Sequence, residues 1–401
     1  MRLTKNSISQ VCLAVIIILL TTSFSFALGE GDRNLLLIGV MAISPIIVLL
    51  HLKLYQSDLL LILFMVSIVT IPIINQPDSF RLSTVLYSML FGFTFLAYKR
   101  LLYRSNFSIK NYQNLLRYLI YAYFLVLLIQ QFSVLFGLPI LNINNYLEEA
   151  PWKLNSLAAE PSHSARIVAV LFFCFILVKE MIMQRKYNIG LDLKNDKLVW
   201  LSFLWTMLTM GSATAILFAG LILLRLIKTS SFIAIIIGIS LFINFTGIIP
   251  FNRIAQLFMA ISELDRDVLI AVDHSASVRI VPILIVFEIA NITSVNGWFG
   301  YGIDYVSTIL YREFPGIPEN YSGGGLFQLW VEYGFVSFLL FVIFSFSSVY
   351  KKGEYLLILF WLMLIATSGI NSQIVWLTII LFMTNKYYYK TTTKQVLHAN
   401  S

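Results

Sequence analysis

Residues 115–138 read LLRYLIYAYFLVLLIQQFSVLFGL, and Arg117 is the only charged residue among them. An α-helix needs about 20 consecutive, mostly apolar residues to cross the hydrocarbon core of a bilayer. Residues 11–28 and 232–249 are apolar runs of similar character without any charged side chain. Because lipid offers no water to the backbone, such a run must satisfy its own hydrogen bonds, as a helix does. Each run therefore predicts a membrane-spanning helix.

The same composition extends over the whole chain. Of its 401 residues, 59% are hydrophobic and 12% are charged, which excludes a soluble globular domain. The hydropathy pattern predicts an all-α, polytopic membrane helix bundle of about 12 transmembrane helices, built as a single membrane domain over residues 1–401. The expected spans are residues 11–28, 35–52, 59–75, 83–98, 115–138, 165–183, 198–210, 213–227, 231–249, 326–349, 355–370 and 374–386.

The distribution of Lys and Arg predicts the orientation of this bundle. Only Gly211 and Ser212 separate the spans 198–210 and 213–227, and one long kinked helix is the alternative, which would reverse the sidedness of every later segment. With two spans, most of the 28 Lys and Arg residues fall on the side of the N-terminus, as the positive-inside rule requires of the cytoplasmic side. The exceptions are Arg33, Arg81, Lys153, Arg166, Arg253, Arg266, Arg279 and Arg312. We therefore expect both termini in the cytoplasm.

Charge, cysteines and the N-terminal run narrow the class further. Topology and attraction to anionic lipid headgroups account for the net charge of +8, so no nucleic-acid partner is expected. Cys12 and Cys174 lie in different predicted spans, so we expect neither a disulfide nor a metal cluster. We expect residues 11–28 to be a retained span rather than a signal peptide, because the run is long and lacks a small-residue cleavage site.

Two predicted outside segments, residues 139–164 and 250–325, are longer than the other loops. Long loops on a rigid scaffold are where binding and catalytic residues concentrate. Between Phe251 and Ile261 apolar residues recur at helical spacing, which predicts an amphipathic helix on the membrane surface. Residues 280–293 form a second apolar stretch, expected to be re-entrant or interfacial.

A first cluster of reactive side chains lies at the predicted start of the span 165–183. Glu160, His163 and Arg166 place an acid, an imidazole and a guanidinium within seven residues. Pro161 suits the first position of a helix, where its missing N–H costs nothing. A helix N-terminus with an Arg nearby is a natural anion site. The alternative is a capped helix start in which Glu160 pairs with Arg166.

A second cluster runs from Asp273 to Ile280 and continues from Asn296 to Asp304. Arg279 begins an apolar stretch, where an unpaired cation is costly enough to suggest a partner or an anionic ligand. The alternative is an interfacial Arg that snorkels to headgroups. Since the segment 250–325 holds four Arg against eight acids, it is not a general basic patch, and Arg266 is most simply a solvated ion-pair residue.

Several signatures of other classes are missing. The sequence has no Walker A loop, no zinc-like His/Cys spacing and no nucleophile elbow, so neither a metal nor another cofactor is expected. The predicted spans lack a chain of ionisable residues of the kind that marks ion-coupled pumps, which counts against a transporter.

Three short motifs carry a resemblance to a known family. They are Ala159-Glu160-Pro161-Ser162, then Ser277-Val278-Arg279 with GWFGYG at residues 297–302, then LWVEYG at residues 329–334. In order and spacing they resemble the elements of the O-antigen polymerase (Wzy) family, within the O-antigen polymerase and ligase group. Related sequences often carry a His just before the last motif, whereas residues 319–322 contain none, which favours polymerase over ligase.

The resemblance implies a glycosyltransferase on the periplasmic side of a bacterial inner membrane. It would transfer a growing saccharide from undecaprenyl diphosphate to a new lipid-linked repeat unit without a metal, with a chain-length regulator as a possible partner. Arg279 and Arg166 would neutralise the diphosphate, and Glu160 or His163 would accept the proton of the attacking hydroxyl. The residues expected to contact substrate are Arg253, Arg312, His274, Trp298, Tyr301 and Asp304.

Three other readings stay open. An O-antigen ligase would use a lipid A core acceptor. A flippase or other transporter of lipid-linked oligosaccharides would need a polar path through the spans, which the nearly uncharged helices disfavour. A scaffolding membrane protein would give no reason to concentrate Glu, His and Arg at the mouths of two loops.

Overall fold

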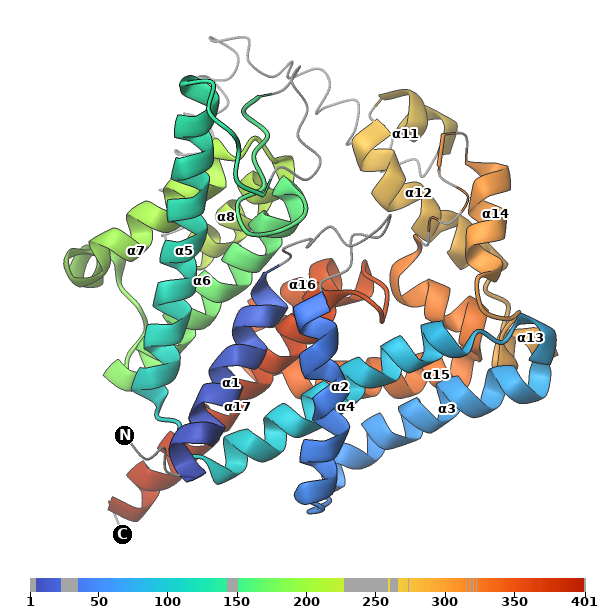
Figure 1. The fold of residues 1–401 in the computed structure, drawn as a ribbon, viewed down its shortest axis with the longest axis horizontal. Helices are drawn as coiled ribbons and strands as arrows, with labels where there is room; N and C mark the ends of the chain where they lie inside the picture. The colour runs from blue at the N-terminus through green and yellow to red at the C-terminus, as the bar shows by residue number, and fades with distance from the viewer. Residues whose placement is uncertain are drawn as a thin grey trace.

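The computed structural model is described for residues 5–22, 35–142, 151–226, 259, 266–272, 274–314, 316–317, 319, 321 and 323–399. Within these ranges all regular structure is helical (Figure 1). Four helical segments are long and apolar enough to cross a membrane, namely Gln56–Asn75, Leu82–Arg104, Ile109–Leu135 and Gly325–Val349. The chain is thus an all-α protein with membrane-capable helices.

The chain folds into a series of helices. In chain order they are α1 (Lys5–Thr21), α2 (Leu35–Leu50), α3 (Leu59–Asn75), α4 (Leu82–Arg104), α5 (Ile109–Leu135), α6 (Pro161–Met183), α7 (Ile189–Thr209), α8 (Ala213–Leu226), α11 (Arg266–Val272), α12 (His274–Ile289), α13 (Val295–Phe299), α14 (Tyr305–Glu313), α15 (Gly325–Val349), α16 (Tyr355–Trp361) with a π-helical turn (Leu362–Ala366), and α17 (Gln373–Ala399). The longest connection between two consecutive described helices before α8 runs from α5 to α6, over residues 136–160.

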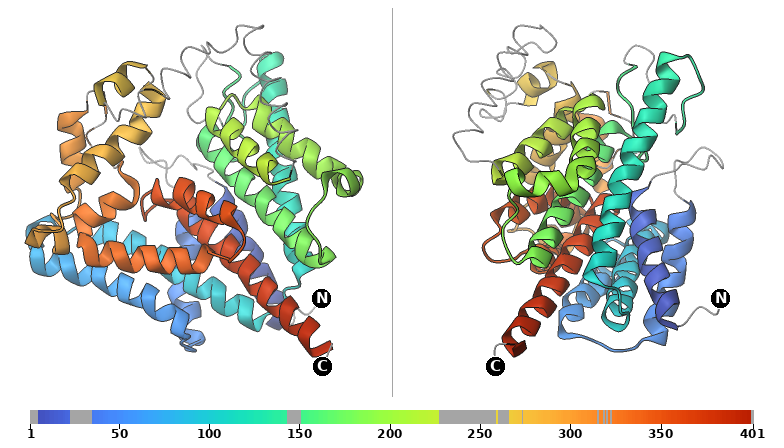
Figure 2. Two further views of the ribbon diagram at one scale, coloured as in Figure 1. Left: turned by 180° about the vertical axis from the view of Figure 1, so that it is seen from behind. Right: turned by 90° about the vertical axis from the view of Figure 1, so that its left-hand side faces the viewer.

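The helices form three groups around a central pair. Figures 1 and 2 show α5 to α8 on one side, α2 to α4 with α15 on the other, and α1 and α17 between them. The contacts agree, since α6 packs on both α5 and α17, α1 packs on α4 and α17, and α3 packs along α15. The smaller helices α11, α12 and α14 lie together beyond the start of α15.

The predicted spans 198–210 and 213–227 correspond to two separate helices. α7 and α8 pack against each other across Gly211, whose φ of 68° is one that glycine adopts without strain. The alternative of one long kinked helix is therefore wrong. α7 is kinked at Asp196, where its backbone is not helical, and the part after the kink agrees with the predicted start at residue 198. The part before the kink was not predicted; it begins at Ile189, where the Asn188 side chain accepts a hydrogen bond from Leu191 N and caps the helix.

Other predicted boundaries differ from the observed ones. The stretch 280–293, expected to be re-entrant or interfacial, belongs to helix α12, which contains Pro282 and ends at Ile289. α17 continues past the predicted residue 386 into a polar C-terminal segment. The whole predicted span 231–249 lies outside the described residues, and so does the predicted amphipathic helix at residues 251–261 apart from the single residue 259.

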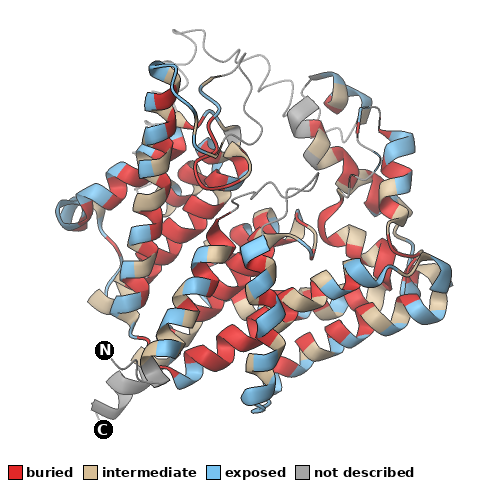
Figure 3. Ribbon diagram, in the orientation of Figure 1, coloured by how far each residue is buried: buried red, intermediate tan, exposed pale blue. Residues whose placement is uncertain are grey.

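Aromatic packing fills the interior around α6 and α17. Every residue from Ile167 to Val178 is buried, and Figure 3 shows this part of α6 buried on all sides. The Phe172 ring stacks on Phe203 with centroids 3.9 Å apart, and Phe91 stacks on Trp376 at 5.9 Å. Outer helices instead expose large apolar side chains, as a lipid-facing surface requires: Leu63, Val66, Leu86, Leu125, Ile129 and Leu201.

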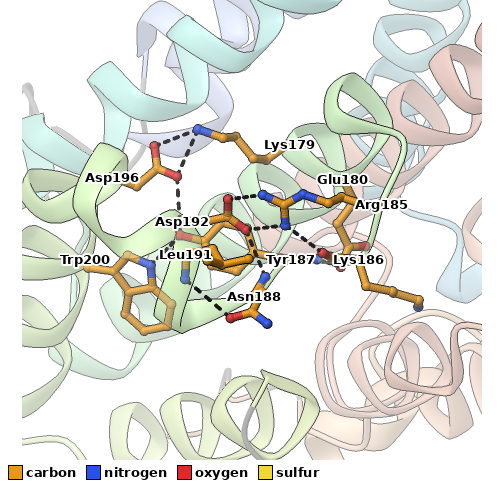
Figure 4. Close-up of polar contacts among 10 residues, drawn as sticks. All are labelled: Lys179, Glu180, Arg185, Lys186, Tyr187, Asn188, Leu191, Asp192, Asp196 and Trp200. Carbon is orange, nitrogen blue, oxygen red and sulfur yellow. Dashed lines mark hydrogen bonds and ion pairs between the residues drawn. The ribbon is translucent and has the colours of Figure 1, made fainter.

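Ion pairs join α6 and the turn that follows it to α7 where α6 ends (Figure 4). Further ion pairs there join α6, α8 and the start of α16. Arg225 of α8 bridges two carboxylates, with Nη2 2.7 Å from Glu180 Oε2 and Nε 2.9 Å from Glu354 Oε2. Arg185 donates to both oxygens of Asp192 at 2.8 and 2.5 Å. We call this region, together with the nearby cationic end of α17, the basic end.

Candidate functional site

The first predicted cluster lies at the start of α6. Pro161 is the first residue of the helix and Glu160 precedes it with extended backbone, as the sequence predicts. The Glu160 carboxylate accepts a hydrogen bond from Ser162 Oγ at 3.2 Å and lies 4.0 Å from His163 Nε2. Both side chains of this acid–imidazole pair are about half exposed, at 46% and 48%. Arg166 is half-buried one turn further along and donates to Ser162 O at 3.4 Å.

The loop before α6 is a folded shelf held by buried polar groups of α5. Gln130 Nε2 donates to Asn155 Oδ1 at 3.0 Å, and Ser156 N donates to Gln130 Oε1 at 2.8 Å. Asn155 and Ser156 are almost fully buried. Because both groups of the Gln130 amide are engaged, the loop is fixed relative to α5, and the start of α6 with it. Sequence analysis missed Gln130, although a polar side chain inside an apolar run was the available signal.

Two segments of the other motifs pack directly on each other. Residues 297–302, which include α13, lie against residues 330–334 of α15. Two hydrogen bonds join them, from Tyr301 N to Val331 O at 2.7 Å and from Trp330 Nε1 to Gly297 O at 2.9 Å. We call this contact the glycine junction.

Glycine is required on both sides of the glycine junction. Gly300 and Gly334 have φ of 85° and 84°, in the left-handed region that L side chains rarely adopt. A Cβ on Gly300 would overlap the carbonyl of Glu332, and one on Gly334 would overlap the carbonyl of Trp298. α15 consists of two helical parts that meet at a kink, where the backbone of Gly334 is not helical. The two motifs are distant in sequence, but they lie next to each other in space because their backbones are in direct contact.

A polar pocket of about 220 Å³ adjoins the glycine junction. It lies between α15 and the loop that leads into α17, and its lining residues are Gly325, Gln328, Leu329, Glu332, Tyr333, Gly369, Ile370, Asn371 and Ser372. The Glu332 side chain accepts from Gln328 Nε2 at 3.2 Å, and the residue is only 3% exposed. We call this the Glu332 pocket. Glu332 belongs to a motif but was not predicted as a site residue.

The predicted substrate-binding residues near the glycine junction have protein partners. The Asp304 carboxylate lies 2.7 Å from Arg81 Nη1, and Tyr301 stacks on Tyr305 with centroids 4.9 Å apart. Trp298 is 42% exposed. Tyr301, Asp304 and Arg81 line one pocket beyond the end of α3, whereas the Trp298 ring packs on Phe335.

The remaining predicted site residues lie on α12, on α14 or outside the described residues. Arg279 and His274 lie on α12, of which the backbone is described at both positions. Arg253 lies outside the described residues. Arg312 has a 74% exposed side chain that pairs with Glu313 at 3.4 Å. Arg266 pairs with Glu288 and Glu313, an ion-pair role of the kind expected.

The start of α6 and the Glu332 pocket lie at the same end of α6 and α17. These helices pack side by side in parallel: Phe173 contacts Phe382, and further on Met181 and Asn385 line one cavity. Counting back equally from Phe173 and Phe382 places Ser164 level with Gln373, the first residue of α17. The pocket residue Ser372 immediately precedes it. The two clusters therefore share one end, away from the basic end.

A metal site is not defined by the described residues. No group of three or more His, Cys, Asp or Glu gathers among them. Asp265 and Asp267 have the Asp-x-Asp spacing that is found in metal-dependent sugar transferases, a pattern not included among the predicted sites. Asp265 lies outside the described residues.

The structure defines an all-α protein with membrane-capable helices, a half-exposed acid–imidazole pair on a rigid shelf, and a buried polar pocket at the same end. No family model, no curated protein and no solved structure matches this chain.

Proposed function

We propose that this protein polymerises lipid-linked oligosaccharide repeat units of an O-antigen or related surface polysaccharide. It would do so as a protein of about 12 spans in a bacterial inner membrane, with both termini cytoplasmic and the start of α6 on the periplasmic side. The observation that carries the proposal is the Glu160–His163 pair, 4.0 Å apart and half exposed, with Arg166 one turn away on the same helix. A proton acceptor and a cation held on a rigid support are what a glycosyl transfer from a diphosphate requires.

The reaction joins two lipid-linked saccharides. A hydroxyl oxygen of the acceptor sugar forms a bond to the anomeric carbon of the donor, and the bond from that carbon to the diphosphate oxygen breaks. The diphosphate leaves with the bonding electron pair, still attached to its undecaprenyl chain. The hydroxyl proton passes to Glu160 or His163. If His163 takes it, the Glu160 carboxylate beside it stabilises the imidazolium that forms.

The leaving group sets the second requirement. A diphosphate carries several negative charges, and preorganised cations stabilise the charge that develops as the bond breaks. Arg166 supplies one guanidinium beside the acid–imidazole pair, in the first turns of α6, where the helix dipole favours an anion. Arg279 on α12 would supply the second. Guanidinium suits this task because its planar donors engage phosphate oxygens in pairs.

The test is polymerisation in vitro with the full-length protein purified in detergent. Undecaprenyl-diphosphate-linked repeat units are supplied and products are separated by chain length on a gel, with and without a metal chelator. The variants are Arg166→Ala, Arg279→Ala, His163→Ala and Glu160→Gln. Lys110→Ala is the matched control, because Lys110 is an exposed cation at the other end of α5.

The outcomes separate the candidate functions. A ladder that persists with chelator, is lost with the arginine variants and is kept with the control supports the proposal. A ladder that chelator abolishes would turn attention to Asp265 and Asp267. Transfer to a lipid A core acceptor alone would replace the polymerase with a ligase, and movement of the lipid-linked unit between leaflets without transfer would replace it with a flippase.

A further inference from the structure

The Glu332 pocket differs from the larger cavity at the basic end in how its polar groups are paired. That larger cavity has a volume of about 450 Å³, and the two carboxylates in its wall, Glu180 and Glu354, are both engaged by Arg225. In the Glu332 pocket, the Tyr333 hydroxyl is buried and has no hydrogen-bond partner among the described residues. A buried hydroxyl without a partner costs free energy, so its presence suggests that a ligand or water completes it.

The residues that line the pocket carry both hydrogen-bond donors and acceptors. Glu332 is an acceptor on its buried wall and is fixed by Gln328 and by backbone donors of Asp304 and Val306. The Tyr333 hydroxyl can donate and accept. Asn371 is exposed and contributes an amide, so the pocket is open to solvent on that side. Leu329 and Ile370 complete the lining with apolar surface.

Charge excludes the phosphate part of the proposed substrate from this pocket. The lining residues include no Lys or Arg, so nothing in the pocket would neutralise the charge of a diphosphate placed there. A neutral sugar ring fits the chemistry better, because each hydroxyl both donates and accepts, while its C–H face packs on apolar side chains. The volume of about 220 Å³ is below the range of roughly 300–1,000 Å³ typical of drug-sized ligands. This suits a single ring.

We propose that the Glu332 pocket binds one sugar ring of the lipid-linked oligosaccharide, with Glu332 accepting a hydrogen bond from one ring hydroxyl and the Tyr333 hydroxyl pairing with another. The proposal rests on the proposed function for its substrate class. It separates two tasks at one end of the molecule: cations beside α6 hold the diphosphate, and the uncharged saccharide is held on α15.

Tyr333→Phe is the sharpest variant. It removes only a hydroxyl that has no protein partner among the described residues, so the fold should be unaffected or slightly more stable, and a purely structural pocket would show no other change. Tyr311→Phe is the matched control, because Tyr311 is exposed on α14. Glu332→Gln tests the acceptor with nearly unchanged shape.

The measurement is isothermal titration of the full-length protein in detergent with a panel of neutral methyl hexosides and methyl N-acetylhexosaminides. A free amino sugar and inorganic phosphate serve as charged probes. We expect a neutral glycoside to bind, Tyr333→Phe to weaken binding by about 3- to 10-fold, the range of one hydrogen bond, and Tyr311→Phe to leave it unchanged. In the polymerisation assay, Tyr333→Phe should raise KM for the acceptor with little change in kcat.

The failures of the two proposals are distinguishable. If the wild type polymerises while Tyr333→Phe changes neither glycoside binding nor KM, the pocket assignment is wrong and the polymerase stands. Tyr333-dependent glycoside binding in a protein that makes no ladder would leave the pocket assignment intact and remove the polymerase. Binding of the amino sugar or phosphate alone, or of no probe together with an unchanged KM, would overturn the sugar site.

Discussion

Single residues decide how the basic end is held together, and Arg225 is the most connected of them. It neutralises Glu180 and Glu354, whose side chains are only 12% and 7% exposed. Arg225→Ala would leave Glu180 without its arginine partner and Glu354 paired with Lys186, although both carboxylates are nearly buried. We expect a loss of about 3–5 kcal/mol in the free energy of unfolding, the range for breaking a buried ion pair.

The measurement is unfolding in detergent by chemical denaturant. Arg312→Ala is the comparison, because its pair with Glu313 has a 74% exposed cation and should matter by at most about 1 kcal/mol. Equal effects of the two changes would show that burial does not set the strength of the Arg225 pairs.

The same network predicts how stability depends on pH. Burial alone would raise the pKa of Glu354, but hydrogen bonds from Arg225 and Lys186 hold that pKa below its ordinary value of 4.5. Arg185 likewise holds the pKa of Asp192 below 3.8. A depressed carboxyl pKa stabilises the fold above the unfolded-state pKa, and this contribution is lost as the pH falls through the folded-state value.

We therefore expect the thermal midpoint in detergent to fall as the pH is lowered from about 6 to about 3. Glu354→Gln should flatten this dependence, because the amide does not titrate. A pH profile unchanged by that substitution would mean that other groups carry the acid sensitivity.

Residue identities in the candidate site were only partly predictable. The spacing of Glu160, His163 and Arg166 around Pro161 was enough to place them on one helix start, because short-range geometry follows from helix periodicity. The partners of Gln130 and Glu332 come from other elements, and no local pattern specifies which segments will meet. For that reason the shelf and the Glu332 pocket emerged only with the fold.

At the scale of elements, the glycine junction is the contact that joins α13 to α15. Gly334→Ala combines a positive φ with overlap of the Trp298 carbonyl, and we expect it to cost more than about 2 kcal/mol in the free energy of unfolding. The same experiment on Gly300→Ala should give a similar loss.

Gly220→Ala is the control for these changes. Gly220 lies within α8, and beyond the backbone of its own helix no heavy atom lies within 4 Å of the point that a Cβ would occupy. Alanine should therefore be neutral there or stabilise the helix by up to about 1 kcal/mol. If Gly334→Ala were equally neutral, backbone contact at the glycine junction would not be tight.

Element boundaries were predictable where the sequence carries a local signal. Gly211 separates α7 from α8, and Pro161 begins α6, in line with the known preferences of these residues. The helical segment of α7 that precedes the kink at Asp196 was not predicted, because its polar residues, capped by Asn188, give no hydropathy signal. The kink at Gly334 was missed because a lone glycine in an apolar run has many explanations until its neighbour is known.

At the scale of the whole molecule, the proposed topology predicts which surfaces face which compartment. Lys153 and Lys390 are both exposed, one on the shelf before α6 and the other near the end of α17. In cells, a membrane-impermeant thiol reagent should label Lys153→Cys from outside and should reach Lys390→Cys only after permeabilisation. Cys12 is replaced by Ser in both variants, and the fully buried Cys174 is retained.

Labelling of both positions from the same side would contradict the proposed arrangement, in which an odd number of crossings separates them. A reversed pattern would keep the number of crossings odd and invert the orientation.

Hydropathy and charge were sufficient to predict an all-α membrane-capable protein, because lipid constrains every span in the same way. They contain no information on how the helices tilt or group, since tertiary contacts determine that.

Trp376, which stacks on Phe91, lies in an environment that should affect its fluorescence. The Trp376 indole is 1% exposed, and its N–H donates to the carbonyl of Ile370 at 2.7 Å, one of the residues that line the Glu332 pocket. An indole shielded from water emits at shorter wavelength than one in contact with it, and its emission responds to the dipole it binds. With its other tryptophans replaced, the protein would report occupancy of the pocket by its own fluorescence, without any attached label.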